Sequence, residues 1–400
     1  MTRRVPRVLW TEARGPALDG VPLALRGAVP SFDGRDGRVA FAAERADLEA
    51  AGLELIDWAA GESLPRAADP RWARAAFVAA PTARAGDVVA TLRRSLLDQA
   101  CGDGAKHLAA ALAGFERPAS RWSLRGRELA LERGRPIVMA VLNATPDSFS
   151  DGGRWNTRSA IERGVELAAQ GARIVDVGGE STRPGSEPIA AQLELERVLP
   201  VIEGIARRSD VALSIDTTKA AVAEAALAAG AVIVNDTSAL ADDPALATVV
   251  ARAGAGLVLM HRLAPPRTMQ DAPRYEDCAA EVADALAERA AFAVESGIAP
   301  ASIVLDPGIG FGKRLEDNLD LVAAIGSLRS LGFPVLLGAS RKGFLGALTG
   351  RPASGRDAAT LATTAVAFAA GCEIVRVHDA ASTLDFLRVL SACAGPERAE

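Results

Sequence analysis

Short apolar runs alternate with longer amphipathic stretches from Ile137 to the C-terminus. Each run is rich in Val, Ile or Leu and ends at or near a polar residue, and a turn containing Gly or Asp follows. The eight runs are IVMAVLN (137–143), RIVDVGG (173–179), VALSID (211–216), AVIVND (231–236), GLVLMH (256–261), SIVLDPG (302–308), PVLLGAS (334–340) and EIVRVH (373–378). Such uniformly apolar runs are typical of parallel strands that are buried on both faces.

The stretches between the runs have helical periodicity, and several end at a glycine just past the last apolar position. Examples are 158–170, 219–230, 278–296 and 357–371. Eight strand–helix units over about 260 residues predict an α/β fold of the closed (β/α)8 TIM barrel type. An open, doubly wound sheet is the alternative, but it usually has fewer strands and a glycine-rich dinucleotide fingerprint after the first one.

The segment before the barrel predicts a short β-hairpin over RWSLRGRELAL (121–131), which we expect to plug the N-terminal end of the barrel. Further upstream, helices are predicted near 83–98 and 104–114, in a small N-terminal α/β region. We therefore predict two parts, an extension of unknown function (1–118) and a catalytic barrel domain (119–395).

Composition excludes several classes of protein. A formal net charge of −5 and a pI near 5.5 give no general attraction to nucleic acid or anionic membrane. No span reaches the roughly 18 apolar residues that a membrane helix needs. The four cysteines are far apart and form no CxxC pair, which favours reduced thiols, a cytoplasmic protein and no zinc site.

Polar residues stand at the end of every predicted strand. Because a barrel enzyme builds its site from the carboxyl ends of its strands, these are the candidate site residues. They are Asn143, Asp176, Asp216, Asn235 with Asp236, His261, Asp306, Ser340 to Lys342, and Arg376 with His378. Any single one of them is equally explained as a helix cap, but the complete ring predicts a ligand site.

The ring divides by charge. The acceptors and amide of Asp176, Asp216, Asn235 and Asp306 suit a flat heterocycle with several N–H donors. The cationic donors Arg183, Lys342, Arg376 and His378 suit a phosphate or diphosphate. One pocket is therefore expected to hold both ends of one molecule.

Four loops carry further signals. NATPDSFSDGG (143–153) and GGESTRPGS (178–186) are long and rich in Gly, Pro and small polar residues, as mobile barrel lids are. The glycines of DPGIGFGK (306–313) suit either phosphate or the close approach of a flat ring, with Phe311 packing nearby. SRKG (340–343) begins a helix whose first N–H groups favour an anion such as a carboxylate.

These motifs resemble the dihydropteroate synthase family, in order and over about 121–393. The matching blocks are LNATPDSFSDGG, VDVGGESTRPGS, SIDTTK, IVNDTSAL, LDPGIGFGK, GASRKGFLG and IVRVHD. The resemblance implies a transferase of folate biosynthesis. Such an enzyme joins p-aminobenzoate to 7,8-dihydropterin-6-ylmethyl diphosphate and releases diphosphate, with the assistance of Mg²⁺. The resemblance also implies small-molecule substrates and a homodimer formed through residues 357–371 and the last helix.

The resemblance also assigns roles to residues. Asn143 would contact the metal and diphosphate, and Asp216, Asn235, Asp306 and Lys342 would bind pterin. Arg376 would flank the pterin ring and, with His378, hold diphosphate. Thr182 and Arg183 belong to the loop around both substrates, while Phe149 and Pro184 would shape the p-aminobenzoate pocket. Ser340 and Gly343 belong to the anion-binding turn, and Asp176 is placed to steady positive charge on the pterin methylene carbon.

The chain departs from the family pattern at a few positions. Ala144 stands where Val is usual, and Gly343 replaces a frequent Ser whose hydroxyl can bind the carboxylate of p-aminobenzoate. Arg262, Leu263 and Ala264 replace Met, Gln and Gly in the fifth strand's loop. The altered 262–264 segment and the extra N-terminal region leave one alternative, a non-catalytic pterin-binding paralogue or partner protein. A second alternative is a pterin-dependent methyltransferase module, which would share the barrel and the acidic residues but would have no use for Arg183, Arg376 and His378.

Overall fold

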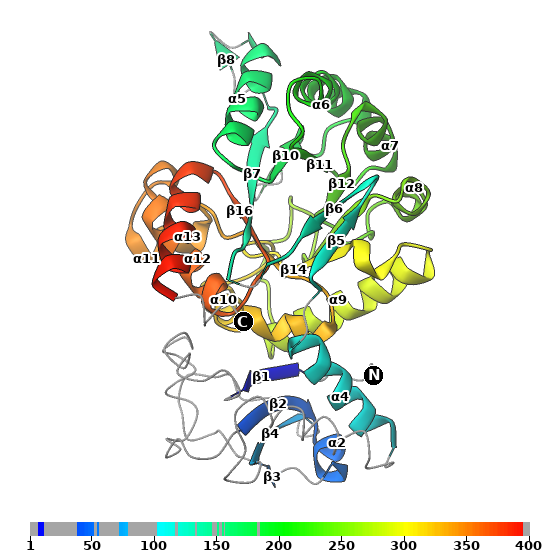
Figure 1. Ribbon diagram of the computed structural model, residues 1–400, viewed down its shortest axis with the longest axis vertical. Helices are drawn as coiled ribbons and strands as arrows, with labels where there is room; N and C mark the ends of the chain where they lie inside the picture. The colour runs from blue at the N-terminus through cyan, green and yellow to red at the C-terminus, as the bar shows by residue number, and fades with distance from the viewer. Residues whose placement is uncertain are drawn as a thin grey trace.

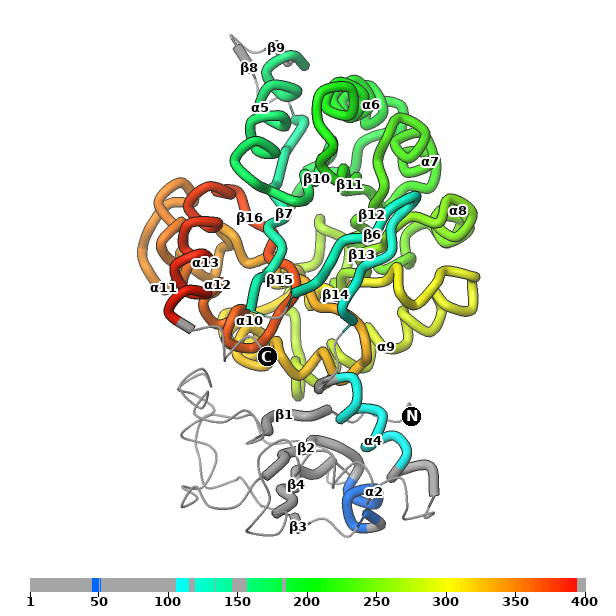
Figure 2. The backbone as a smooth tube through the Cα atoms, in the orientation of Figure 1, coloured from blue at the N-terminus to red at the C-terminus, as the bar shows by residue number. Residues whose placement is uncertain are grey.

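We describe the protein from a computed structural model (Figures 1 and 2). The structure describes residues 7–11, 38–51, 54–55, 72–78, 102–116, 119–132, 134–145, 150–151, 154–155, 157–181 and 185–394. The predicted helix near 83–98 lies outside these residues.

Eight parallel strands form the barrel, and each corresponds to one of the eight apolar runs. They are β7 (Ile137–Asn143), β10 (Ile174–Gly178), β11 (Ala212–Asp216), β12 (Ile233–Asp236), β13 (Gly256–Met260), β14 (Ile303–Asp306), β15 (Leu336–Leu337) and β16 (Ile374–Val377). They pair in the order β14-β13-β12-β11-β10-β7-β16-β15. A single bridge between Leu305 and Val335 joins the two end strands, so the predicted TIM barrel is confirmed.

The strand register brings the polar strand ends to one end of the barrel. Gly178 on β10 pairs with Asn143 on one side and with Asp216 on the other, and Asp216 pairs with Asn235. On the next strands Met260 pairs with Asp306. Side chains far apart in the sequence therefore reach one shared space.

Helices surround the strands (Figure 2). They are α5 (Thr157–Ala169), α6 (Ala191–Ala206), α7 (Ala220–Ala229), α8 (Ala245–Ala253), α9 (Cys278–Glu295), α10 (Leu315–Ala323), α11 (Gly343–Thr349), α12 (Asp357–Ala369) and α13 (Ala380–Ala394), with 3₁₀ helices η3 (Pro300–Ser302), η4 (Ile325–Leu331) and η5 (Ala353–Gly355). A two-stranded ribbon, β8 (Ser150–Asp151) with β9 (Arg154–Trp155), lies in the first long loop. The apolar helix faces pack on the strands in one continuous core.

The hairpin of β5 (Arg121–Leu124) and β6 (Arg127–Ala130) closes the amino end of the barrel, as predicted (Figure 1). Its apolar side chains and those at the amino ends of the barrel strands form a separate buried cluster. Trp122 is completely buried there, and its indole N–H donates to the Ser302 carbonyl at 2.8 Å. Gly256 leaves room for the hairpin, because a Cβ atom there would lie 2.4 Å from Leu124 and 3.2 Å from Trp122.

The N-terminal region contains both strands and helices, which confirms the predicted α/β character. Its described elements are β1 (Arg7–Thr11), β2 (Arg38–Glu44), α2 (Arg45–Ala50), β3 (Glu54–Leu55), β4 (Trp72–Val78) and α4 (Gly102–Glu116), and the strands pair antiparallel in the order β1-β2-β4-β3. Helix α4 corresponds to the helix predicted at 104–114. It packs against η4 of the barrel so closely that a Cβ at Gly114 would lie 2.9 Å from the Arg329 carbonyl oxygen.

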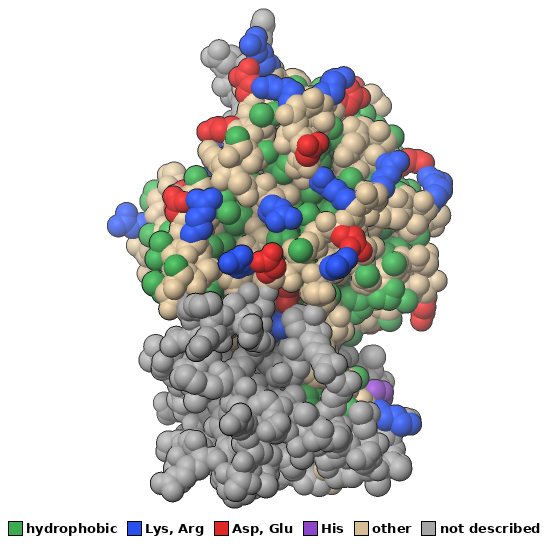
Figure 3. Space-filling view, in the orientation of Figure 1, with side chains coloured by type: hydrophobic (Ala, Val, Ile, Leu, Met, Phe, Trp, Pro, Cys, Tyr) green, Lys and Arg blue, Asp and Glu red, His purple; other side chains and the backbone are tan. Residues whose placement is uncertain are grey.

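Charged side chains of both signs are interspersed over the barrel face in Figure 3. Within the part of the chain that the structure describes, no helix has the length and apolar character needed to span a membrane.

Candidate active site

A pocket of about 310 Å³, counting the part open to solvent, lies at the carboxyl ends of the strands. It is lined by Asp216, Asn235, Thr237, Met260, Asp306, Gly308, Ile309, Phe311, Gly338, Lys342 and Arg376. Six of the residues predicted for the site therefore surround one cavity: Asp216, Asn235, Asp306, Phe311, Lys342 and Arg376.

Arg376 on β16 forms ion pairs with two carboxylates. Its guanidinium donates to Asp176 Oδ2 and to Asp216 Oδ2, each at 2.7 Å. Asp176 is fully buried and also accepts from Asn235 Nδ2 at 2.9 Å. The planar guanidinium satisfies both acceptors at once, so four side chains from four strands hold one another in place.

Two pocket groups titrate near neutral pH. Burial raises the pKa of Asp216 to about 7, with the Asp176 carboxylate adding to the effect and Arg376 opposing it. Burial lowers the pKa of Lys342 to about 7, against the attraction of Asp306. A carboxyl group with a raised pKa takes up a proton more readily and can then donate as well as accept a hydrogen bond, which suits a heterocycle that carries both kinds of group.

Asp306 and Phe311 come from the loop that follows β14. Asp306 Oδ1 accepts from the backbone N–H of Gly308 at 2.7 Å, and burial raises the pKa of this carboxyl. The Lys342 ammonium lies 3.9 Å from the centre of the Phe311 ring, a cation–π contact. A flat ring would thus meet a carboxylate, a cation and an aromatic face in one pocket.

Ser340 and His378 contact each other beside the pocket. The Ser340 hydroxyl accepts from the backbone N–H of His378 at 3.2 Å and lies 3.0 Å from its Nδ1. Burial, together with the Arg376, Arg341 and Lys342 charges, lowers the pKa of His378 to about 4. The sequence predicted a cationic donor at His378, but burial among cations favours the neutral ring, which still donates one hydrogen bond.

The remaining predicted residues fall into two groups. Asn143 ends β7, and Gly343 begins α11, where a Cβ atom would meet open space. Phe149, Thr182, Arg183 and Pro184 lie outside the described residues. Their roles therefore remain predictions.

The altered segment after β13 is partly buried. Arg262 pairs with Asp242, Leu263 is exposed, and Ala264 packs against Met260, Met269 and Phe311. The backbone N–H of Gly185 donates to the Pro266 carbonyl at 3.0 Å. The substitutions thus retain a folded loop that contacts both the pocket wall and the second signature loop.

Sequence reasoning missed Thr237, Met260, Gly308, Ile309 and Gly338 as pocket-lining residues. Thr237 comes directly after the predicted strand-end residues Asn235 and Asp236. Its hydroxyl has no hydrogen-bond partner among the described residues. The others are apolar or lack a side chain, so a search for polar strand ends could not identify them.

The pocket should make stability depend on pH through Asp216. A carboxyl whose folded pKa is raised to about 7 contributes stability that is complete below its unfolded pKa, about 3.9, and is lost as pH rises through about 7. Asp216→Asn removes this titration. We expect the unfolding free energy of the wild type, relative to the variant, to fall between pH 4 and 8 in urea denaturation.

The control for this measurement is Asp385→Asn, because Asp385 is exposed on α13. The difference between wild type and control should be flat over the same range. A flat or rising difference for Asp216→Asn would contradict the assignment.

Together these features define a class of protein, a (β/α)8-barrel enzyme with a polar pocket for a flat heterocycle and an anion. Residues 139–378 match the family model described as pterin binding enzyme. A curated relative, the dihydropteroate synthase of Mycobacterium leprae, is 46% identical over 270 residues, which are 65% of this chain and 95% of the relative. The chain belongs to the dihydropteroate synthase family, transferases of folate biosynthesis.

Other relatives agree. The dihydropteroate synthase of Escherichia coli is 42% identical over 264 residues, covering 66% of this chain and 93% of that protein. The solved Xanthomonas albilineans enzyme with 4-aminobenzoic acid has a TM-score of 0.65 and 43% identity, covering 69% of this chain and 99% of that one. The same enzyme with 7,8-dihydropteroate has a TM-score of 0.62 and 41% identity, with the same coverage.

Proposed function

We propose that this chain condenses 7,8-dihydropterin-6-ylmethyl diphosphate with p-aminobenzoate to give 7,8-dihydropteroate and diphosphate. The observation that carries the proposal is the single pocket lined by Asp216, Asn235, Asp306, Lys342 and Arg376. It combines acceptors and donors for a pterin ring with cations for the charged group attached to it.

The pterin ring is bound by the acidic side of the pocket. Asp216, Asn235 and Asp306 face its N–H and carbonyl groups, while Phe311 and Met260 supply apolar wall. Asn235 is oriented by its hydrogen bond to Asp176, so its amide is set before a ligand arrives.

The reaction breaks the bond between the methylene carbon and the diphosphate oxygen and forms a bond from that carbon to the amine nitrogen. Arg376 and Lys342 attract the diphosphate, with Asn143, Arg183 and His378 as its further predicted partners. Asp176 keeps one buried oxygen, Oδ1, without a hydrogen bond among the described residues, and this negative charge favours a cation-like carbon. An aromatic amine is already a competent nucleophile, so the mechanism needs no strong base.

The donor set fits a weakly held Mg²⁺. The described residues contain no cluster of three His, Cys, Asp or Glu side chains that could hold a metal. Mg²⁺ often uses only one or two protein oxygens, with substrate phosphates and water as its other ligands. Asn143 would be the protein ligand, and the bound ion would neutralise charge on the leaving diphosphate.

The second substrate is held by the turn before α11 and by the two signature loops. Ser340, Gly343 and the first N–H groups of α11 favour its carboxylate. Phe149, Thr182 and Pro184 are predicted to shape the rest of its pocket.

A diphosphate-release assay with both purified substrates tests the proposal. We expect release that requires the pterin diphosphate and p-aminobenzoate together, and formation of dihydropteroate in equal amount. A folded protein that releases no diphosphate would favour the non-catalytic paralogue.

The same assay on a chain that begins at Ser120 tests the domain boundary. The proposed division at 118/119 removes α4, and with it the Gly114 contact on η4. We expect the shortened chain to retain catalysis, since the described pocket residues all come from the barrel, and to unfold at a lower temperature.

Gly343→Ser is expected to improve the use of p-aminobenzoate. A Cβ at this position meets open space, so the backbone need not move, and the hydroxyl adds a donor for the carboxylate. One hydrogen bond to a charged group corresponds to about 1.5–3 kcal/mol, so the KM for p-aminobenzoate should fall roughly tenfold or more. Gly343→Ala is the matched control, and an equal effect of Ala and Ser would contradict this explanation.

We infer that the protein is a homodimer in the cytoplasm. Val389 on α13 and Leu348 on α11 are exposed apolar side chains at 63% and 54%, on the side of the barrel predicted to pair. Cys278 and Cys372 are free thiols, in keeping with a reducing compartment. Light scattering of the purified chain tests the dimer.

A further inference from the structure

Lys313 lies behind the pocket wall and not in the pocket. Lys313 stands at the end of the glycine-rich loop after β14 and is only 3% exposed. Its ammonium is 3.0 Å from His261 Nδ1, 3.1 Å from the Phe311 carbonyl oxygen and 3.4 Å from the His261 carbonyl oxygen. The lysine therefore joins the loop after β14 to the end of β13.

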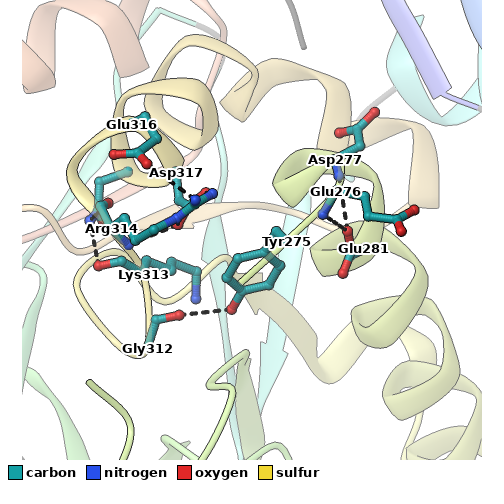
Figure 4. A network of polar contacts seen from close by, with 10 residues as sticks. Tyr275, Glu276, Asp277, Glu281, Gly312, Lys313, Arg314, Glu316 and Asp317 are labelled. Carbon is teal, nitrogen blue, oxygen red and sulfur yellow. Dashed lines mark hydrogen bonds and ion pairs between the residues drawn. The ribbon is translucent and has the colours of Figure 1, made fainter. Parts of the chain in front are cut away.

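Other contacts hold the same two segments together. The Tyr275 hydroxyl donates to the Gly312 carbonyl at 2.9 Å, and the Gln270 amide donates to the Gly310 carbonyl at 2.9 Å. Figure 4 shows Tyr275 pointing at Gly312, with the Lys313 side chain extended beside it. The loop carbonyls thus face donors from the segment after β13.

Glycine is required where the two segments meet. Gly308 has a φ of 68°, and a Cβ atom there would lie 1.8 Å from the His261 carbonyl oxygen. Gly312 has a φ of 66°, and its Cβ would lie 2.7 Å from Leu263 Cβ. Side chains cannot fill this contact, so the shape of the loop depends on hydrogen bonds, both within the loop and from the segment after β13.

The two joined segments supply one wall of the pocket. Met260 comes from β13, and Gly308, Ile309 and Phe311 come from the loop after β14. A shift of the Phe311 backbone would move its ring away from the Lys342 ammonium and change the surface that a flat ligand meets.

We propose that Lys313 is a positioning residue for the pterin site. It fixes the positions of Phe311 and His261 relative to each other without touching the substrate. This rests on the proposed function, and it assigns the lysine an effect on pterin affinity rather than on the chemical step.

The charge state of the cluster supports the donor role. Burial lowers the pKa of Lys313 to about 8, opposed by the carboxylates of Asp306 and Asp317, so the ammonium form predominates at pH 7. Burial and the Lys313 charge lower the pKa of His261, whose ring is therefore neutral. Because Nδ1 accepts from the ammonium, the ring proton resides on Nε2.

The test compares Lys313→Met with Lys106→Met, an exposed lysine on α4, by steady-state kinetics. Lys313→Met should raise the KM for the pterin diphosphate roughly tenfold, while kcat and the KM for p-aminobenzoate at saturating pterin diphosphate change less than about threefold. Tyr275→Phe, which removes one of the parallel contacts, should shift the same KM in the same direction by a smaller factor. Lys106→Met should match the wild type.

A spectroscopic measurement separates positioning from loss of fold. The chain has three histidines, so the ¹⁵N signals of the His261 ring can be assigned by substitution. The Nε2–H tautomer should dominate in the wild type, and its share should fall in Lys313→Met because Nδ1 loses its donor.

An unchanged pterin KM, or a loss confined to kcat, would overturn the inference. If Lys313→Met does not fold, Tyr275→Phe decides the outcome by the same criteria. Failure of the proposed function is distinct, because the wild type itself would then release no diphosphate.

Discussion

Replacing Arg376 with methionine is expected to abolish catalysis and to destabilise the protein. Its guanidinium lies 2.7 Å from both Asp176 and Asp216, and the Asp176 side chain is fully buried. Removing the shared cation leaves two carboxylates uncompensated, which costs about 3–5 kcal/mol for a buried pair. The pocket also loses the guanidinium that we propose holds diphosphate, so kcat/KM should fall by about 10³-fold or more.

Diphosphate release and urea denaturation measure the two effects. Arg376→Lys keeps the charge but not the planar fork, so it should recover part of the stability and little of the activity. Arg388→Met, at an exposed ion pair on α13, controls for loss of an arginine. Activity within tenfold of wild type in Arg376→Met would show that the guanidinium has no part in the reaction.

Trp122→Ala is expected to be the most destabilising single truncation at the opposite end of the barrel. The side chain is completely buried, and its loss leaves a cavity between the hairpin and the strand ends. Truncation of a buried Trp costs about 3–5 kcal/mol. The KM values of the folded enzyme should not change, because the hairpin lies at the end of the barrel away from the pocket.

Trp122→Phe separates packing from hydrogen bonding. Phe keeps most of the ring but leaves the Ser302 carbonyl without its donor, at a cost of about 1–3 kcal/mol. Urea denaturation of the three proteins checks the order. Equal stability of Trp122→Ala and wild type would mean that the hairpin does not support the barrel.

The barrel could be predicted because the amino-acid composition of its strands shows that they are buried. Runs such as 137–143 and 231–236 are apolar on both faces, and few folds bury eight such runs in succession. The alternation of Trp122 and Leu124 likewise indicated the hairpin. Within the described residues, predicted and observed helices differ only by small shifts at their ends, since end residues are not determined by periodicity.

The site was predicted in part for the same reason. Polar residues at strand ends meet in any closed barrel, which placed Asp216, Asn235, Asp306 and Arg376 together. The sequence does not show how deeply a side chain is buried, and burial lowers the pKa of both His378 and Lys313. From the sequence alone a histidine or lysine is counted as a possible cation, but the surroundings of the side chain set its pKa.

The closure of the barrel has a dynamic consequence. Strand β15 has two residues, and only the Leu305–Val335 bridge joins it to β14. The register pairs fewer residues across this junction than across any other between neighbouring strands of the barrel, so its amides should exchange with solvent through local opening before those of the other strands. Asp306 and Gly338 adjoin this seam and line the pocket, so an occupied pocket should slow that exchange and tie the weakest part of the barrel to its ligand.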